Sequence, residues 1–328
     1  MRVRRRYARL VRDLLAASSG GFRRLEARLA KPLRVFVYHR VAGPSVSPWD
    51  STVTPEHFEQ QVEVLTRSGR VIAIDENLSR RPGSAYRFVI TLDDGYLDNL
   101  ESALPALEHH DAPATVFVVP DLVDMPFFWW DRLAEVVLNP LTEVPRVLEA
   151  AVDTRLLRDP QVWTQAPGDR REALDSLYRQ LTKRPATEAV GVVDEISRAV
   201  GFNPSPDAPR PLTTDELCRL ASHPLITIGS HSSSHRRLTT LPVPQANRDI
   251  TQAAHRLDAL LGPMRRPFAY PHGDSSPHVA RLVRDAGHHA AFTTVSRPVS
   301  VLDDHHLLPR IATADVDGAQ FAHLRGLA

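Results

Sequence analysis

Two stretches of the sequence combine residue types that can carry out hydrolytic chemistry. The first is the pair Asp93-Asp94, followed by Gly95, at the end of an apolar run that begins near Arg87. In a continuing strand the two carboxylates would point to opposite sides, so a turn at Gly95 is needed to bring both into one site. An Asp at this position can also simply cap the next helix. The pair alone therefore leaves a structural and a chemical interpretation open.

The second stretch contains His231 and His235, which follow an apolar run at residues 225–229. Histidines four residues apart lie on one side of a helical turn, where both imidazoles can bind one ion. The chain has 15 histidines, so coincidental spacing is the alternative. With one Asp of the pair, the histidines make a three-ligand site with an open position, which is typical of catalytic zinc. We predict a divalent metal, with Zn²⁺ favoured, and the second Asp as general base.

Seven predicted strands position these residues. They lie at residues 34–38, 71–74, the run before Asp93, 114–119, 225–229, 267–270 and 290–295. Helical patterns separate most of them, which favours a parallel sheet that a chain of 328 residues can close into a barrel. His39, the Asp pair and His231 each follow the carboxyl end of a strand, where the active sites of such folds lie.

A long segment at about 131–215 interrupts the alternation of strands and helices. It has helical patterns at 133–138, 171–181 and 189–200, separated by segments that contain proline, and no convincing strand. We predict an inserted helical subdomain. Trp129 and Trp130 stand at its start, where they either stack on a sugar or form the hydrophobic seam of the insertion.

Composition excludes several classes of protein. The hydrophobic fraction is 42%, and no apolar run approaches the roughly 20 residues of a membrane span. The net charge of +1 provides no general attraction for nucleic acid, so we expect no nucleic-acid partner. The chain has a single cysteine, Cys218, and therefore no internal disulfide. Oligomeric state is not predictable from these features.

The first 34 residues are strongly basic, with ten Arg and one Lys against Asp13 and Glu26. Arg12 and Asp13 interrupt the apolar residues that a secretion signal would need, so we expect a cytoplasmic protein. We predict a basic helical segment at 1–33. It either packs on the domain or contacts an anionic membrane surface at the inner face of the membrane.

Three motifs together resemble those of the polysaccharide deacetylase (NodB homology) family, also known as carbohydrate esterase family four. They are Thr91–Tyr96 (TLDDGY), Ser230–His235 (SHSSSH) and Phe268–Gly273 (FAYPHG). Tyr38–Val41 (YHRV) and Leu308–Ile311 (LPRI) extend the resemblance over nearly the whole chain from residue 33 to 311. Their order and spacing make it highly specific.

The resemblance implies a distorted (β/α)₇ barrel over residues 34–328 and metal-dependent hydrolysis of N-acetyl groups on amino sugars. It assigns Asp93 as the base and Asp94, His231 and His235 as ligands of the metal, usually zinc. We interpret Tyr270, Pro271 and His272 of the third motif as substrate-binding residues, together with Trp129 and Trp130. A backbone N–H near residues 270–272 would stabilise the oxyanion.

The sequence departs from the common family pattern in two places. No apolar strand ending in His-Asp occurs near the C-terminus, and the chain instead resembles a permuted branch in which His39 is the general acid. His305 and His306 are the alternatives, which we otherwise interpret as exposed loop histidines. Ala269 stands where an Arg is usual, so whether Arg266 reaches the base is open.

We therefore predict a metal-dependent hydrolase that removes an N-acetyl group from an amino sugar of a glycan or glycan precursor. One alternative is a deformylase or deacetylase of a small nucleotide- or lipid-linked sugar. A second, from another class, is a catalytically inactive carbohydrate-binding protein.

Overall fold

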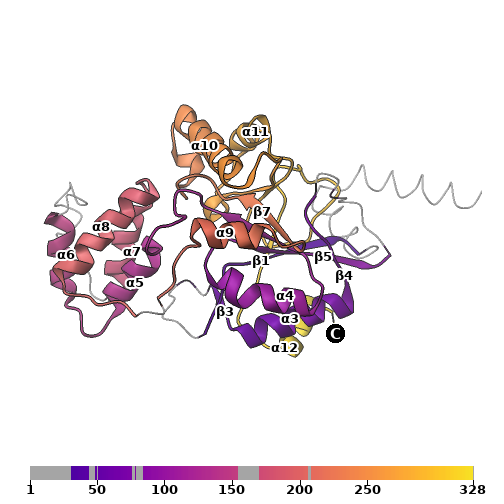
Figure 1. Cartoon of the computed structure of the whole chain (residues 1–328), viewed down its shortest axis with the longest axis horizontal. Coiled ribbons are helices and arrows are strands. Elements are labelled where there is room, and N and C mark those ends of the chain that lie inside the picture. The colour runs from indigo at the N-terminus through magenta and orange to yellow at the C-terminus, as the bar shows by residue number, and fades with distance from the viewer. Residues whose placement is uncertain are drawn as a thin grey trace, which may run out of the picture.

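A parallel β-sheet forms the centre of the protein, and helices cover it on both sides (Figure 1). The computed structural model describes residues 31–43, 49, 51–75, 78, 84–153, 170–205 and 208–327. The predicted basic segment at 1–33 lies almost wholly outside these residues. The sheet consists of β1 (Leu33–Tyr38), β4 (Gly69–Val71), β5 (Tyr86–Leu92), β6 (Ala114–Val118), β7 (Ile226–Ser230), β8 (Phe268–Ala269), β9 (Ala291–Phe292) and β10 (Ile311–Ala312).

The strands run in the order β10, β1, β5, β6, β7, β8, β9, and β4 pairs with β5 outside this path. The two ends of the sheet meet through one segment near the C-terminus. Leu308 forms a parallel bridge to Phe292 of β9, and Ile311 pairs with Phe36 of β1. This closure confirms the predicted barrel. The barrel is distorted because the closing segment pairs with each neighbour over only one or two residues.

The register of β1 and β5 sets the position of the site. The two strands pair in parallel along their whole common length, from Leu33 opposite Arg87 to Tyr38 opposite Leu92. The residues that follow, His39 and Asp93, therefore emerge at the same end of the sheet. All pairings in the described sheet are parallel, so the carboxyl ends of β6, β7 and β8 lie at that end as well.

Amphipathic helices cover the barrel. Pro55 occupies the first turn of α3 (Pro55–Ser68), which buries Phe58, Val62 and Leu65. Thr213 and Glu216 form a capping box at the start of α9 (Thr214–Ala221). The remaining elements around the barrel are β2 (Arg40–Val41), β3 (Thr52–Val53), the π-helix η1 (Asn99–Ala103), α4 (Leu104–His109), η3 (Leu238–Thr240), α10 (Val243–Leu261), η4 (Pro271–Gly273), α11 (Pro277–Asp285) and α12 (Gly318–Arg325).

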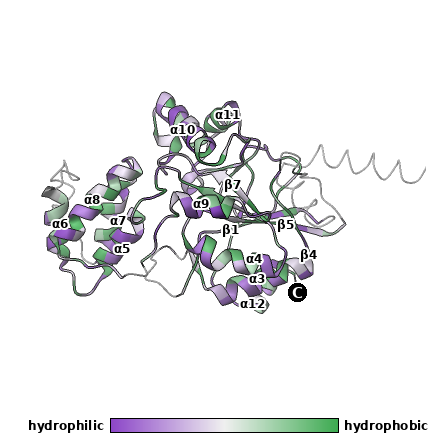
Figure 2. Ribbon diagram, in the orientation of Figure 1, coloured by the Kyte–Doolittle hydropathy of each residue, from purple (hydrophilic) through white to green (hydrophobic). Residues whose placement is uncertain are grey.

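Four helices between β6 and β7 form a separate group on the left of Figure 1. They are α5 (Trp129–Leu138), α6 (Val144–Asp153), α7 (Arg170–Leu181) and α8 (Ala186–Ala199). Hydrophobic and hydrophilic residues both occur along these helices (Figure 2). The hydrophobic ones form a second core, which also includes Tyr96, Val119 and Leu122. The next helix, α9, packs Leu217 and Leu220 into the barrel core, so the group ends before residue 215.

The strands differ from the sequence expectation at several points: β2 and β3 were not predicted, and β9 is shorter than the predicted strand at 290–295. The predicted strand at 71–74 lies earlier, at Gly69–Val71, because Ile74 turns into the core from a loop. The closing strand β10 was not predicted, since a pair of residues in an irregular segment carries no alternating pattern. None of the helices in the described ranges is both long and apolar enough to cross a membrane.

Candidate active site

A cavity of about 200 Å³ opens at the carboxyl ends of the strands. Parallel strands collect the residues that follow them at this edge. Seven of the ten predicted site residues line the cavity: His39, Asp93, Asp94, Trp130, His231, His235 and His272.

The double Asp is divided by a sharp turn. Asp93 continues the sheet, since its N–H donates to the carbonyl of Tyr38 at 2.9 Å. Asp94 then adopts a left-handed conformation with φ of 75°, and Gly95 follows with φ of 84°. The predicted turn thus begins one residue earlier than Gly95. A non-glycine residue in this conformation costs about 1–3 kcal/mol and is typical of functional sites.

Asp94, His231 and His235 converge at the rim of the barrel. Oδ1 of Asp94 lies 3.5 Å from Nε2 of His231 and 3.2 Å from Nε2 of His235. Oδ1 is shielded from solvent and accepts no hydrogen bond from any described residue. Two imidazole nitrogens and a carboxylate oxygen that approach without bonding one another fit a shared cation, and this donor set suits Zn²⁺.

The surroundings of the histidines orient them for such a cation. Nδ1 of His231 lies 2.9 Å from the carbonyl of Ala269, which leaves Nε2 facing Asp94. The predicted helical turn between the histidines is wrong. The segment is a loop in which His235 is left-handed, and Asp249 holds the loop by accepting hydrogen bonds from Ser233 N–H and the Ser234 hydroxyl.

Burial and charge keep Asp94 and His231 in the forms that bind a cation. Burial alone would raise the pKa of Asp94, but the nearby histidines outweigh it and hold the pKa well below its usual range. Burial lowers the pKa of His231 to about 4. At neutral pH the pair is therefore a carboxylate and a neutral imidazole.

Arg310 holds the second carboxylate, Asp93. Its two terminal guanidinium nitrogens donate to Oδ1 and Oδ2 of Asp93 at 2.6 and 2.7 Å. Arg310 is fully buried and also donates from Nε to the carbonyl of Thr293. Burial alone would raise the pKa of Asp93, but Arg310 and His231 outweigh it and keep the pKa below its usual value.

Arg266 does not reach the base, which settles a question that the sequence left open. Its guanidinium donates to the carbonyl of Gly262 and lies 3.6 Å from Asp258.

Sequence reasoning missed the role of Arg310, although it singled out the motif that contains this residue. A lone arginine among Leu308, Pro309 and Ile311 near the strand β10 was the available signal.

The structure separates the three candidate acids. His39 lines the cavity, and Asn99 fixes its backbone by donating to its carbonyl at 2.9 Å. His305 and His306 lie elsewhere, each with a ring nitrogen 2.9 Å from a backbone carbonyl, of His289 and His288 respectively. His306 is buried rather than exposed, which corrects our interpretation of it as a loop residue at the surface.

The predicted substrate-binding residues divide into two sets. Trp130 and His272 line the cavity, and the ring centre of each is 4.7 Å from the ring centre of His235. Tyr270 is buried and donates its hydroxyl to the carbonyl of His306, and Pro271 and Trp129 are buried as well. Among the described residues these three side chains are not part of the cavity lining.

Three aromatic residues of the cavity were not predicted as site residues: Tyr96, which ends the TLDDGY motif, and Trp49 and Tyr178, which stand outside the motifs. Trp49 precedes β3, Tyr178 belongs to α7, and their ring centres are 4.6 Å apart. Tyr178 shows that the inserted helices contribute directly to the site. Neither Trp49 nor Tyr178 stands in a motif, and the packing of an inserted helix against a distant loop leaves no trace in the local sequence.

The barrel brings the converging side chains together at the carboxyl ends of its strands, where the active sites of parallel barrels lie. The chain belongs to the polysaccharide deacetylase family, whose model matches residues 80–146 and 185–291, more than half of the chain. It is accordingly a hydrolase that acts on amide bonds in glycan deacetylation. No curated protein matches the chain significantly.

Solved structures share the fold at low sequence identity. The Streptococcus pyogenes deacetylase PplD matches with a TM-score of 0.58 and 14% identity, over 91% of this chain and 99% of that one. IcaB from Ammonifex degensii matches with a TM-score of 0.58 and 16% identity, over 90% and 97%. A de-N-acetylase from Aggregatibacter actinomycetemcomitans gives 0.55 and 13%, over 91% and 100%.

Proposed function

We propose that this hydrolase removes an N-acetyl group from an amino sugar of a glycan or glycan precursor and that it depends on a divalent metal ion. One observation carries the proposal. Asp93, a buried carboxylate held by Arg310, lies directly beside the converging Asp94, His231 and His235. A base and a cation site are thus adjacent but chemically separate.

Asp94, His231 and His235 are the residues that would hold the cation. A divalent cation there, with Zn²⁺ favoured, lowers the pKa of a water molecule and polarises the acyl oxygen. Each of the three presents one ligand atom within 4.8 Å of the others. At neutral pH Asp94 is ionised and His231 is neutral, and metal binding requires these forms of the two side chains.

Asp93 acts as the general base. The pKa of its carboxyl is depressed, so it is ionised at neutral pH and can accept a proton from the attacking water. The two hydrogen bonds from Arg310 fix the orientation of the carboxylate. His39, at the end of the neighbouring strand β1, then protonates the leaving amine and releases acetate.

Within the predicted stretch 270–272, we assign one backbone N–H as the donor to the oxyanion. The N–H of Tyr270 already donates to Phe292 at 3.0 Å, and Pro271 has no N–H. His272 is left, and it lines the cavity with a left-handed φ of 58°. We assign the oxyanion contact to its amide.

The sugar ring is placed against the aromatic side of the cavity. Trp130, Trp49 and Tyr178 supply flat apolar faces there, and the indole N–H of Trp130 donates to Tyr96 at 2.8 Å. Such faces suit the C–H surfaces of a pyranose, while the carboxylates and imidazoles stand at the other side. Trp129, Tyr270 and Pro271 act only through packing in this proposal.

Release of acyl groups tests the function. The purified protein is incubated with N-acetylated and N-formylated amino sugars, free, polymeric and linked to lipid or nucleotide, with and without a chelator. We expect acetate from a glycan substrate and its loss with the chelator. Formate alone, or activity only on small linked sugars, favours the deformylase alternative. Binding of the sugars without any release favours an inactive carbohydrate-binding protein.

We also propose that the basic segment at 1–33 brings the enzyme to an anionic membrane surface in the cytoplasm. Together with Arg34 it holds ten Arg and one Lys against two acidic residues, and anionic lipids attract this charge. Co-sedimentation with vesicles containing phosphatidylglycerol should decline as salt is raised. Equal sedimentation of a variant that lacks residues 1–30 would contradict this role.

A further inference from the structure

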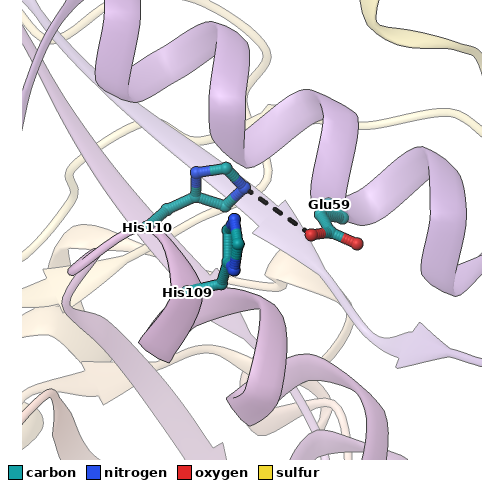
Figure 3. Close-up of side chains that lie close together, drawn as sticks. All are labelled: Glu59, His109 and His110. Carbon is teal, nitrogen blue, oxygen red and sulfur yellow. Dashed lines mark ion pairs between the residues drawn. The ribbon is translucent and has the colours of Figure 1, made fainter.

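A second group of two histidines and a carboxylate lies on the outer surface of the barrel (Figure 3). Glu59 is in α3, His109 is the last residue of α4, and His110 follows it. One ligand atom of each lies within 4.8 Å of the others. None of the three lines the cavity at the strand ends, so this group, the α3–α4 cluster, is separate from the active site.

The hydrophobic core fixes the two helices that carry the cluster. Val62 of α3 and Leu107 of α4 are both fully buried in the barrel core. Glu59 is three residues before Val62, and His110 is three residues after Leu107, so each polar residue lies on the same side of its helix as the buried one. The carboxylate and the imidazoles are therefore brought together by packing that does not depend on them.

One ring nitrogen of His110, Nε2, is buried and makes no hydrogen bond to a described residue. The nearest carboxylate oxygen, Oε1 of Glu59, is 4.0 Å away, which is too far for a hydrogen bond. The ring of His109 stands against that of His110, with centres 4.8 Å apart, and Figure 3 shows both rings beside the Glu59 carboxylate.

The gap fits a cation. Ligand atoms about 2.0–2.2 Å from one zinc ion are about 3.4 Å apart at a tetrahedral angle. The His110–Glu59 pair, at 4.0 Å, must close by about half an ångström, and the other pairs, which lie within 4.8 Å, by at most about 1.4 Å. Glu59 is half-exposed and can make that shift. Nitrogen donors suit transition metals, whereas Ca²⁺ and Mg²⁺ take oxygen ligands.

We propose that the α3–α4 cluster binds a divalent transition-metal ion of the zinc class and so fastens α3 to α4. Three protein ligands bind the ion and water completes its coordination. Because the ligands come from two helices that separate on unfolding, the ion stabilises the native state. The protein then binds two ions per chain when metal is in excess, of which only one lies at the cavity.

Counting bound ions tests the proposal. The metal-free full-length protein is titrated with Zn²⁺ against a chromophoric chelator. We expect two ions for the wild type, one for His109→Gln/His110→Gln, and one for Asp94→Asn. A double variant of exposed histidines on α10 and α11, His255→Gln/His278→Gln, is the matched control and should keep two.

The outcomes separate this proposal from the proposed function. If His109→Gln/His110→Gln binds as many ions as the wild type, the α3–α4 cluster is not a metal site. If that variant loses one ion but Asp94→Asn loses none, the result supports a metal site at the α3–α4 cluster and contradicts the proposed metal site at the cavity. Glu59→Gln provides a milder variant. It should also lose the ion, and an unchanged two-ion titration with this variant contradicts the proposal.

Discussion

The molecule carries the same three donors, two imidazoles and a carboxylate, in two different settings. Asp94, His231 and His235 lie at the ends of two strands, largely buried, with a carbonyl behind His231 and a second carboxylate beside them. In the α3–α4 cluster Glu59, within α3, and His109, at the end of α4, are exposed. Donor type alone therefore does not make a reaction centre.

Asp93 is the residue that distinguishes the two settings. The buried cluster has a further buried carboxylate next to it, which we propose as the base, and Arg310 keeps it ionised. Among the described residues of α3 and α4, by contrast, no carboxylate is buried. A cation at the surface can only join two helices, whereas one at the rim lies next to a group that accepts a proton.

The largest expected effects come from the two adjacent aspartates. Asp93→Asn should keep the metal at the rim and lose about 10²- to 10⁴-fold in turnover, which is the usual contribution of a general base. Asp94→Asn should lose that metal as well as turnover, because it removes a ligand. Acetate release and metal content are measured on both variants with the α3–α4 cluster removed, so that only one ion is counted.

This pair of variants has a clear contrary result. Equal metal content together with equal activity in Asp93→Asn and Asp94→Asn would contradict the division of roles. Glu59→Gln is the matched control, since it removes a carboxylate from the other histidine cluster. It should leave turnover unchanged.

The next effect concerns the arginine behind the base. Arg310→Met leaves a buried carboxylate without its partner, which costs about 3–5 kcal/mol of unfolding free energy. The cost should fall in Asp93→Asn/Arg310→Met, because the uncompensated charge is gone. Arg266→Met, which removes a buried arginine away from the cavity, is the control, and it should show no recovery with Asp93→Asn. Urea denaturation at pH 7 is measured on the wild type, the three single variants and the two double variants.

The same pair predicts a dependence on pH. The pKa of Asp93 is lower in the folded than in the unfolded protein, so its contribution to stability is complete above the unfolded pKa of about 4. It is lost as the pH falls below that value toward the folded pKa. The wild type should therefore lose stability faster than Asp93→Asn between about pH 4 and pH 2. Parallel curves for the two proteins in that window would show that the Arg310 pair does not stabilise the fold.

How far the sequence predicts these features depends on the distance between the partners. Asp93, Asp94, His231 and His235 were predictable because each lies in a short motif directly after a strand, and parallel strands bring such ends together. Arg310 is 217 residues from Asp93, and only the closing of the barrel makes them neighbours. Local patterns carry no information about such a contact.

The same limit explains the misplaced aromatic residues. Trp129 and Trp130 were predicted together, yet the helix beginning at Trp129 turns one ring into its own core and the other toward His235. Tyr178 reaches the cavity from a helix whose apolar positions alone predict burial. Helical periodicity gives a buried face but not the neighbour that covers it.

A smaller effect is expected at the aromatic side of the cavity. Tyr178→Ala should raise KM and lower kcat/KM by about 2- to 12-fold, the equivalent of roughly 0.5–1.5 kcal/mol for an aromatic contact. Tyr270→Phe is its counterpart, because the Tyr270 hydroxyl bonds to His306 outside the cavity. It should leave KM unchanged. A higher KM for Tyr270→Phe, with none for Tyr178→Ala, would favour the original prediction of Tyr270 as a substrate contact.

The smallest expected effect sharpens the comparison of the two histidine clusters most directly. His109→Gln/His110→Gln should keep acetate release within about twofold of the wild type, since the α3–α4 cluster lies outside the cavity. Its thermal midpoint should rise less on addition of Zn²⁺, because a ligand at 100 times its Kd adds about 2.7 kcal/mol to native stability. The difference between the two proteins should vanish when a chelator is present. A loss of turnover as large as that of Asp93→Asn, in a variant that still melts cooperatively, would mean that the surface cluster acts on the reaction centre and is not only a fastening between two helices.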